Sequence, residues 1–295
     1  MSFRNIAVFS VLLAGGVFSG EAQEIVTYTV GKYEVSLLLE RLGDGNPGII
    51  VGADDAALKK YIPTGSFKHQ TNAFLIKSAD RAVVVDTGFG TKIFDHLKTL
   101  GVDPARVEAV IITHMHGDHI SGLQKDGKAC FPNATVYLAE QEKAYWVPAG
   151  GLAGIPADQK QRYELAAQSL APYGNKVKTF RPGELGGKLQ EILPGIAPIA
   201  AFGHTPGHVV VQVQSEGKSL LILADLMHVR YIQFARPDIN MTYDMDAAAS
   251  REMRKKIFDY AAKNKIPITG MHIVSPAFGL LEPLGDGGYN FREIK

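Results

Sequence analysis

Thr113-His114-Met115-His116-Gly117-Asp118-His119 is the stretch around which the rest of the chain is organised. It follows an apolar, β-forming run at residues 107–112, which predicts a buried strand that ends where the polar stretch begins. Neutral imidazole nitrogens and carboxylate oxygens are ligands of divalent metals, and Gly117 lets the backbone bend between them. One ion could not easily take four donors from so short a segment. The spacing therefore suggests two neighbouring ions, one on His114 and His116 and the other on Asp118 and His119.

A histidine-rich surface loop that binds metal only adventitiously is the alternative interpretation of this stretch. Two features favour a true metal site. The stretch stands at the end of an apolar strand, and further histidine and aspartate residues follow apolar strands later in the chain.

The composition excludes several classes of protein. The chain has 295 residues, of which 46% are hydrophobic, enough for a sizeable core and too many for a disordered chain. The formal net charge of +1 implies no general attraction to polyanions, so we expect a small-molecule substrate and no nucleic acid partner. The single cysteine, Cys130, excludes an internal disulfide and a cysteine-based zinc knuckle, and we expect it to pack as a small hydrophobe.

The first residues resemble a secretory signal. Arg4 precedes an apolar run at residues 6–18, and Gly20-Glu21-Ala22 offers small residues to a signal peptidase. The run is too short to span a bilayer comfortably. We expect residues 1–22 to be removed, a periplasmic or secreted protein, and no stable membrane insertion after cleavage. An uncleaved N-terminal anchor is the alternative.

Apolar β-forming runs alternate with helical patterns and Gly- and Pro-containing turns, which predicts one compact α/β domain over residues 23–295. The expected strands are 25–30, 33–39, 71–76, 82–85, 107–112, 135–139, 177–180, 196–202, 209–214, 220–224 and, as the last, 268–271. The expected helices are 54–61, 91–100, 140–146, 158–170 and 246–264. Residues 43–48 predict a loop. A homodimer is compatible with this sequence.

Three features bear on the substrate and on packing. The Gly-rich connector at residues 148–154 could be a lid or a passive surface loop, and Phe234 and Phe278 suggest an apolar pocket or core residues. In the helix expected at 246–264, the residues Ala249, Met253, Ile257 and Tyr260 share one face.

Three more candidate ligands also follow apolar strands. His204 lies in a Gly-Pro turn, Asp225 closes the apolar run 220–224, and His272 follows the run 268–271. A buried carboxylate needs a partner or a metal. Because strand ends that gather at one edge of a sheet hold the chemistry of α/β folds, we expect these residues to meet the first stretch.

In this order and context, His114, His116, Asp118, His119, His204, Asp225 and His272 resemble the dinuclear metallo-β-lactamase superfamily, and Asp86-Thr87-Gly88 resembles its early Asp-Thr-Gly turn. The resemblance implies an αββα sandwich, with two mixed sheets flanked by helices and two metals at one edge. It further implies that His114, His116 and His204 hold one ion, that Asp118, His119 and His272 hold the other, and that Asp225 bridges both.

With an aspartate at position 225, the sequence resembles the branch that contains glyoxalase II, acyl-homoserine lactonases and methyl parathion hydrolase-like enzymes. Within that branch it is most similar to the last group. The implied reaction is hydrolysis of a neutral ester-like bond, in a lactone or an organophosphate triester, by a hydroxide that bridges two divalent ions. Zinc suits the ligands, and iron, manganese or cobalt would also fit. A thioester hydrolase, a β-lactamase and an iron-dependent thiol oxygenase are the competing functions.

The remaining polar candidates receive lesser roles. We assign Asp118 and His228 as catalytic candidates, Asp118 as a ligand that can also carry a proton and His228 as a residue that supports Asp225 or faces the substrate. We expect His208 to make a structural hydrogen bond that steadies the His204 turn, and Asp86 to orient a ligand histidine, with capping of its own turn as the alternative. His69 and His96 are expected to be ordinary surface or packing residues.

Overall fold

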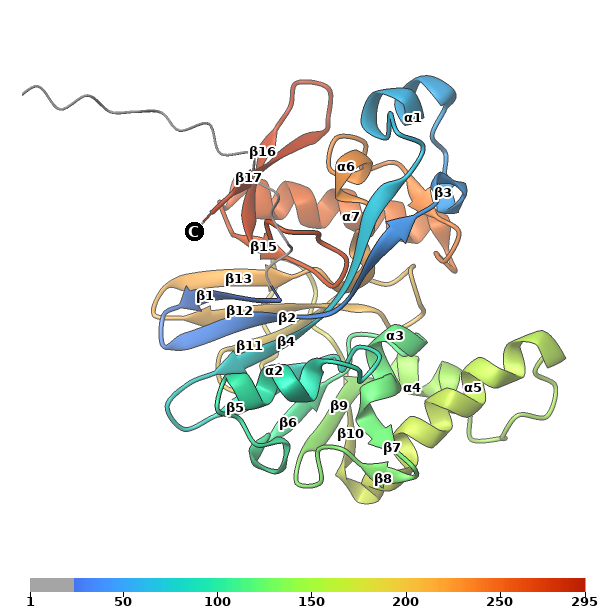
Figure 1. Cartoon of the computed structure of the whole chain (residues 1–295), viewed down its shortest axis with the longest axis vertical. Helices are drawn as coiled ribbons and strands as arrows, with labels where there is room; N and C mark the ends of the chain where they lie inside the picture. Colours follow the sequence, from blue (N-terminus) through green and yellow to red (C-terminus); the bar gives the residue numbers. More distant parts are fainter. Residues whose placement is uncertain (1–23, 295) are drawn as a thin grey trace, which may run out of the picture.

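Two β-sheets pack face to face, and helices cover the outer face of each sheet (Figure 1). The computed structural model describes residues 24–294, so the signal predicted at residues 1–22 lies outside the described residues. The arrangement confirms the predicted αββα sandwich with two mixed sheets.

The first sheet has seven strands in the order β1-β2-β4-β5-β6-β9-β10. Its first four strands are antiparallel to their neighbours, whereas β5, β6, β9 and β10 run parallel. The strands are β1 (Ile25–Val30), β2 (Tyr33–Gly45), β4 (Phe67–Lys77), β5 (Ala82–Val85), β6 (Ala109–Ile111), β9 (Thr135–Ala139) and β10 (Val177–Phe180). Parallel neighbours end at the same edge, so residues that follow β5 and β6 come close together.

The second sheet has six strands in the order β11-β12-β13-β15-β16-β17, and only β13 and β15 are parallel. These strands are β11 (Ile196–Ala200), β12 (Val209–Ser215), β13 (Lys218–Ile222), β15 (Ile268–Thr269), β16 (Gly279–Pro283) and β17 (Tyr289–Glu293). Two short pairs stand outside the main sheets, β3 (Ile50–Val51) with β14 (Asn240–Met241), and β7 (Gln124–Lys125) with β8 (Lys128–Ala129).

Helices α2, α4 and α5 cover the first sheet, and α7 covers the second (Figure 1). The α-helices are α1 (Asp55–Tyr61), α2 (Ile93–Thr99), α3 (Gly117–Ile120), α4 (Glu140–Trp146), α5 (Ala157–Leu170), α6 (Arg230–Gln233) and α7 (Ala247–Lys263). Over residues 24–294, no helix is both long and apolar enough to span a bilayer.

Alternation along the strands explains the layers. Leu37 and Leu39 of β2 face the space between the sheets, where they pack with residues of β12 and β13, whereas Leu38 faces the helices of the first sheet. In the second sheet, Val211 points inward and Val210 points toward α7. Because successive side chains of a strand point to opposite faces, near-continuous apolar runs supply both layers at once.

Two expectations about secondary structure are wrong. Half of the loop predicted at 43–48 is strand, because β2 continues to Gly45 and pairs with β4 as far as Phe67. The chain also does not end its sheet at residue 271. The β16–β17 hairpin adds two more strands, although it joins β15 through one residue pair, Ile268 with Gly279.

Candidate metal centre

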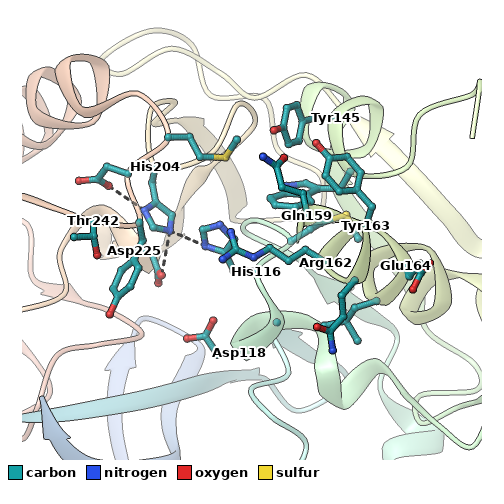
Figure 2. A pocket seen from close by; sticks show the side chains of 18 of the residues that line it. His116, Asp118, Tyr145, Gln159, Arg162, Tyr163, Glu164, His204, Asp225 and Thr242 are labelled. Atoms are coloured by element: carbon teal, nitrogen blue, oxygen red, sulfur yellow. Dashed lines mark hydrogen bonds and ion pairs between the residues drawn. The ribbon is translucent and has the colours of Figure 1, made fainter. Parts of the chain in front are cut away.

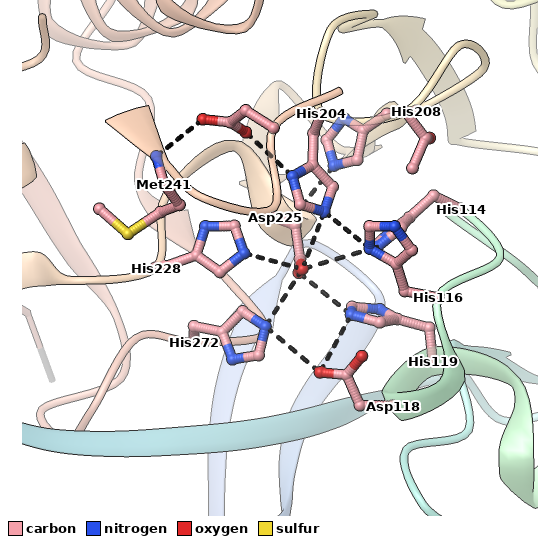
Figure 3. Close-up of polar contacts among 12 residues, drawn as sticks. His114, His116, Asp118, His119, His204, His208, Asp225, His228, Met241 and His272 are labelled. Atoms are coloured by element: carbon pink, nitrogen blue, oxygen red, sulfur yellow. Dashed lines mark hydrogen bonds and ion pairs between the residues drawn. The ribbon is translucent and has the colours of Figure 1, made fainter. Parts of the chain in front are cut away.

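The predicted donor residues follow strands that end at one edge of the sandwich. The stretch that begins at Thr113 follows β6, and α3 begins within it at Gly117. His204 follows β11, Asp225 follows β13 and His272 follows β15. The structure therefore brings all seven predicted residues together, four from the first sheet and three from the second (Figure 3).

The first group of donors consists of His114, His116, His204 and Asp225, whose donor atoms all lie within 4.8 Å of one another. His116 Nδ1 lies 3.1 Å from His114 Nε2 and 3.0 Å from His204 Nε2. Asp225 Oδ2 lies 3.5 Å from His114 Nε2 and 3.4 Å from His204 Nε2. Three imidazoles and one carboxylate oxygen around one point match the donor set of a zinc site.

The second group consists of Asp118, His119 and His272. Asp118 Oδ2 lies 3.7 Å from His119 Nε2 and 3.6 Å from His272 Nε2. Asp225 lies beside this group too, with Oδ1 3.2 Å from His119 Nε2 and Oδ2 3.2 Å from His272 Nε2. Among the residues that the structure describes, Asp225 is thus the one carboxylate in contact with both groups.

The burial of these residues suits bound cations; in their absence Asp225 and its neighbouring carboxylates outweigh burial and raise the pKa of His119, of His204 (to about 9) and of His272, whereas two other imidazoles are neutral. His119 Nε2 and Asp225 Oδ1 are buried and have no hydrogen-bond partner among residues 24–294. Burial lowers the pKa of His114 well below its ordinary value and that of His116 to about 3, so both imidazoles are neutral and can donate a lone pair. Burial alone would raise the pKa of Asp225, but the surrounding imidazoles outweigh it and keep this carboxyl ionised. Buried ligand atoms without hydrogen-bond partners, grouped around an ionised carboxylate, are what a pair of divalent ions would coordinate.

Two buried aspartates orient histidines of the centre. Asp86 follows β5, and its Oδ2 lies 2.7 Å from His119 Nδ1, as expected from the sequence; it also accepts hydrogen bonds from the backbone and hydroxyl of Thr113. Asp244 was not predicted, and its Oδ1 lies 3.0 Å from His204 Nδ1. A carboxylate on the far nitrogen fixes the ring and leaves Nε2 free to ligate.

A third support comes from helix α7. Arg254 is fully buried, and its Nη2 lies 3.5 Å from Asp244 Oδ2. Neither residue is recognisable from the sequence, because Asp244 lies in an irregular polar segment and Arg254 interrupts an apolar helix face.

The other histidines divide into structural and cavity-lining residues. His208 Nδ1 bonds Ala201 O at 3.0 Å and its Nε2 accepts the backbone N–H of Asp225 at 3.1 Å, so it is structural, as predicted. His96 packs in the core, as predicted. His228 Nε2 lies 3.1 Å from Asp225 Oδ2, and the ring stacks on His272.

The expectation for His69 is wrong. It lines the cavity at the centre and stacks on the other face of His272, with ring centroids 4.7 Å apart. Burial lowers the pKa of His69 to about 3, so its imidazole is neutral. The strand predicted to begin at residue 71 begins at Phe67. A prediction with this earlier start would have placed His69 within the strand and made it a candidate for the site.

A cavity of about 990 Å³ opens over the donor groups (Figure 2). Tyr145, Trp146 and Tyr163 form an aromatic wall on α4 and α5, and their rings contact one another. Phe234 and Phe278 are core residues and do not line it. The connector at 148–154 also contributes no lining residue; helix α5 after it does. The wall is thus built on helices.

Comparisons with known proteins agree with this geometry. The model of the metallo-beta-lactamase superfamily matches residues 67–264. An exodeoxyribonuclease, WalJ of Streptococcus pneumoniae, is 26% identical over 166 residues, which are 54% of this chain and 51% of that protein. The chain thus spans about half the length of this curated relative.

Solved structures match nearly the whole chain. A hydrolase of the beta-lactamase superfamily, AbOPH, is 28% identical with a TM-score of 0.82, covering 94% of this chain and 99% of that one. The dizinc quorum-quenching lactonase AidC is 22% identical with a TM-score of 0.81, covering 92% of this chain and 97% of that one. The second likeness concerns the fold alone.

Proposed function

Since this chain belongs to the metallo-β-lactamase superfamily, we propose that it is a dinuclear metal-dependent hydrolase of neutral ester-like substrates, either lactones or organophosphate triesters. One observation supports this more than any other: two donor groups meet under a single cavity and share Asp225. The likeness to the hydrolase AbOPH over 94% of the chain supports the reaction class. The fold of the lactonase AidC is compatible with the ester-like substrate.

The proposed ligands follow the two groups. His114, His116 and His204 would hold one ion, Asp118, His119 and His272 the other, and Asp225 both. Imidazole and carboxylate donors favour zinc, although iron, manganese and cobalt accept the same set. When bound, two such cations supply a nucleophile derived from water at neutral pH and polarise the bond under attack.

The residues around the groups would bind and orient the substrate. Asp118 is, like His116, a partly exposed member of the proposed ligands, with 26% of its side chain accessible, and it lines the cavity, so its carboxylate can accept and return a proton during the reaction. His228 holds Asp225 through Nε2 and would support catalysis from there. The Tyr145–Trp146–Tyr163 wall would receive the apolar part of the substrate and exclude water.

Charge and cavity shape argue against a polyanionic substrate. The net charge is +1, and the α5 side of the cavity combines the aromatic rings with one cation, Arg162, and two acidic residues, Asp158 and Glu164, whereas nucleases bind phosphates with extended basic surfaces. Thioester hydrolase, β-lactamase and iron-dependent thiol oxygenase activities use the same scaffold and are separated from the proposal by experiment.

The test is a substrate panel on the metal-loaded protein, with metal-stripped protein as the control. We expect two equivalents of metal per chain and turnover of a lactone or a phosphotriester that exceeds turnover of a thioester, a β-lactam and single-stranded DNA. Turnover of only the last three would refute the substrate class. An iron spectrum with thiol-dependent oxygen uptake would refute the hydrolase.

A further inference from the structure

A buried carboxylate on α4 joins the two loops that bear the first donor group. Glu142 is fully buried, and it is neither a proposed ligand nor a cavity-lining residue. We propose that Glu142 is a positioning residue that sets the spacing of the His116 and His204 donors. This inference rests on the ligand roles in the proposed function.

One carboxylate oxygen holds the loop of the first sheet. Glu142 Oε1 accepts the backbone N–H of Met115 at 2.8 Å, and Met115 stands between His114 and His116. The same oxygen accepts the indole N–H of Trp146 at 2.7 Å. The Trp146 ring meets His116 edge-on, with centroids 5.7 Å apart. Oε1 therefore fixes both the backbone before His116 and the aromatic ring beside it.

The other oxygen holds the loop of the second sheet. Glu142 Oε2 accepts the Thr205 hydroxyl at 2.7 Å and the Gly207 N–H at 2.8 Å, just after His204. A Cβ at Gly207 would lie 2.3 Å from the backbone nitrogen of Glu142, so this turn is packed directly against α4. Oε2 therefore fixes the turn that presents His204.

The chemistry of the four donors requires a carboxylate. Two are backbone N–H groups and one is an indole N–H, all of which can only donate. An ionised carboxylate accepts all four hydrogen bonds through its two oxygens; burial raises the pKa of Glu142, and the four hydrogen bonds oppose that effect. A buried charge is costly unless it is fully hydrogen-bonded. The Glu142 carboxylate therefore needs the hydrogen bonds of all four partners at once.

The consequence is a fixed distance between residues of different sheets. His116 Nδ1 and His204 Nε2 lie 3.0 Å apart, yet their loops belong to different sheets. Glu142 bonds both loops, and its contact with Trp146 ties the same spacing to the cavity wall. It would preorganise the first donor group without touching it.

Glu142→Gln tests the inference because the amide can satisfy only one side. Its oxygen is expected to face Met115 and Trp146, where both partners only donate, and its NH₂ group then faces the Gly207 N–H. The His204 turn should loosen. With Zn²⁺ alone as the probe and a competing chelator, we expect the affinity of one of the two ions to fall about 10- to 100-fold, with the other unchanged.

The matched control is Glu140→Gln, an exposed residue of the same helix that pairs with Arg181; it should bind two zinc ions as the native protein does. Native affinity for both ions in Glu142→Gln would overturn the inference and leave the proposed function intact. A native protein that binds no zinc would instead overturn the proposed function.

Thr205→Val provides the test if Glu142→Gln does not fold, because it removes one of the four hydrogen bonds and keeps the side-chain volume. A smaller loss of affinity, again confined to one ion, is expected. Unchanged zinc binding by a folded Thr205→Val would overturn the inference.

Discussion

At the scale of single residues, the centre depends on one carboxylate surrounded by imidazoles. Five histidines place a ring nitrogen within 3.5 Å of Asp225: His114, His119, His204, His228 and His272. Without cations, several of these nitrogens compete for the same two oxygens. The proposed ions would separate the roles, leaving Asp225 between two sites and His228 as its support (Figure 3).

His116→Ala is expected to abolish most of the activity. His116 Nδ1 lies between His114 Nε2 and His204 Nε2, so its loss leaves the first group with two imidazoles. Zinc content should fall from two ions toward one, and kcat/KM should fall by at least about 100-fold, since losing even an outer partner of a ligand costs 10–100-fold. Metal analysis and steady-state kinetics on the same preparation check this. Full zinc content together with native activity would contradict it.

Asp244→Asn is expected to weaken the same ion through His204. The Asp244 carboxylate accepts from His204 Nδ1 and also faces Arg254, so an amide there loses the negative charge and places NH₂ near a donor. We expect zinc affinity to fall roughly 10–100-fold. Zinc competition measures it, with Asp126→Asn as the control, since Asp126 is exposed and lies in a left-handed turn that asparagine tolerates. An effect on thermal stability alone would contradict the assigned role.

At the scale of elements, α7 shows where an apolar pattern misleads. The predicted face of Ala249, Met253, Ile257 and Tyr260 is only partly correct: the helix buries Ser250, Arg254, Ile257, Phe258 and Ala261 instead. The buried stripe keeps helical spacing but is rotated, because a charged residue belongs to it. The apolar pattern of the helix does not predict that Arg254 is buried. Its guanidinium N–H groups nevertheless donate hydrogen bonds to backbone carbonyls of the segment between α6 and β14.

Arg254→Met should therefore destabilise the fold more than an ordinary core substitution. It leaves Asp244 buried without its cation and removes the hydrogen bonds to Leu226 O and Ile239 O. Breaking a buried pair costs about 3–5 kcal/mol, which should appear as a lower free energy of unfolding in urea for metal-free protein. Arg251→Met, exposed on the same helix, is the control and should change the free energy of unfolding little. Equal stability of the two variants would show that Arg254 is not a structural anchor.

At the scale of the whole molecule, the sequence predicts the layers and the convergence of donors. Long apolar runs and polar residues at their ends are local signals, so β9 and α4 were predicted with their observed bounds. Contacts that need tertiary structure were not predictable. The two-residue strands β3 and β14 have too little pattern, and Glu142 or Asp244 is recognisable only once loops of both sheets are side by side.

Removal of the metals should lower the stability of the entire sandwich. The proposed ligands come from both sheets: His116 and Asp118 follow β6 of the first, whereas His204 and His272 follow strands of the second. Bound cations would thus cross-link the sheets in the native state only, a gain of about 4 kcal/mol for each ion at a free-metal concentration 1,000 times its Kd.

A chelator should accordingly lower Tm by roughly 8–16 °C for each ion it removes, because about 1 kcal/mol corresponds to 2–4 °C in a chain somewhat smaller than this one. Differential scanning calorimetry with and without EDTA measures the shift, and zinc-saturated EDTA is the control for effects of the chelator itself. The decrease in Tm should be smaller in His116→Ala, because this variant holds less metal for the chelator to remove. An unchanged Tm after verified metal removal would mean that the two sheets hold the donor groups in place without the ions.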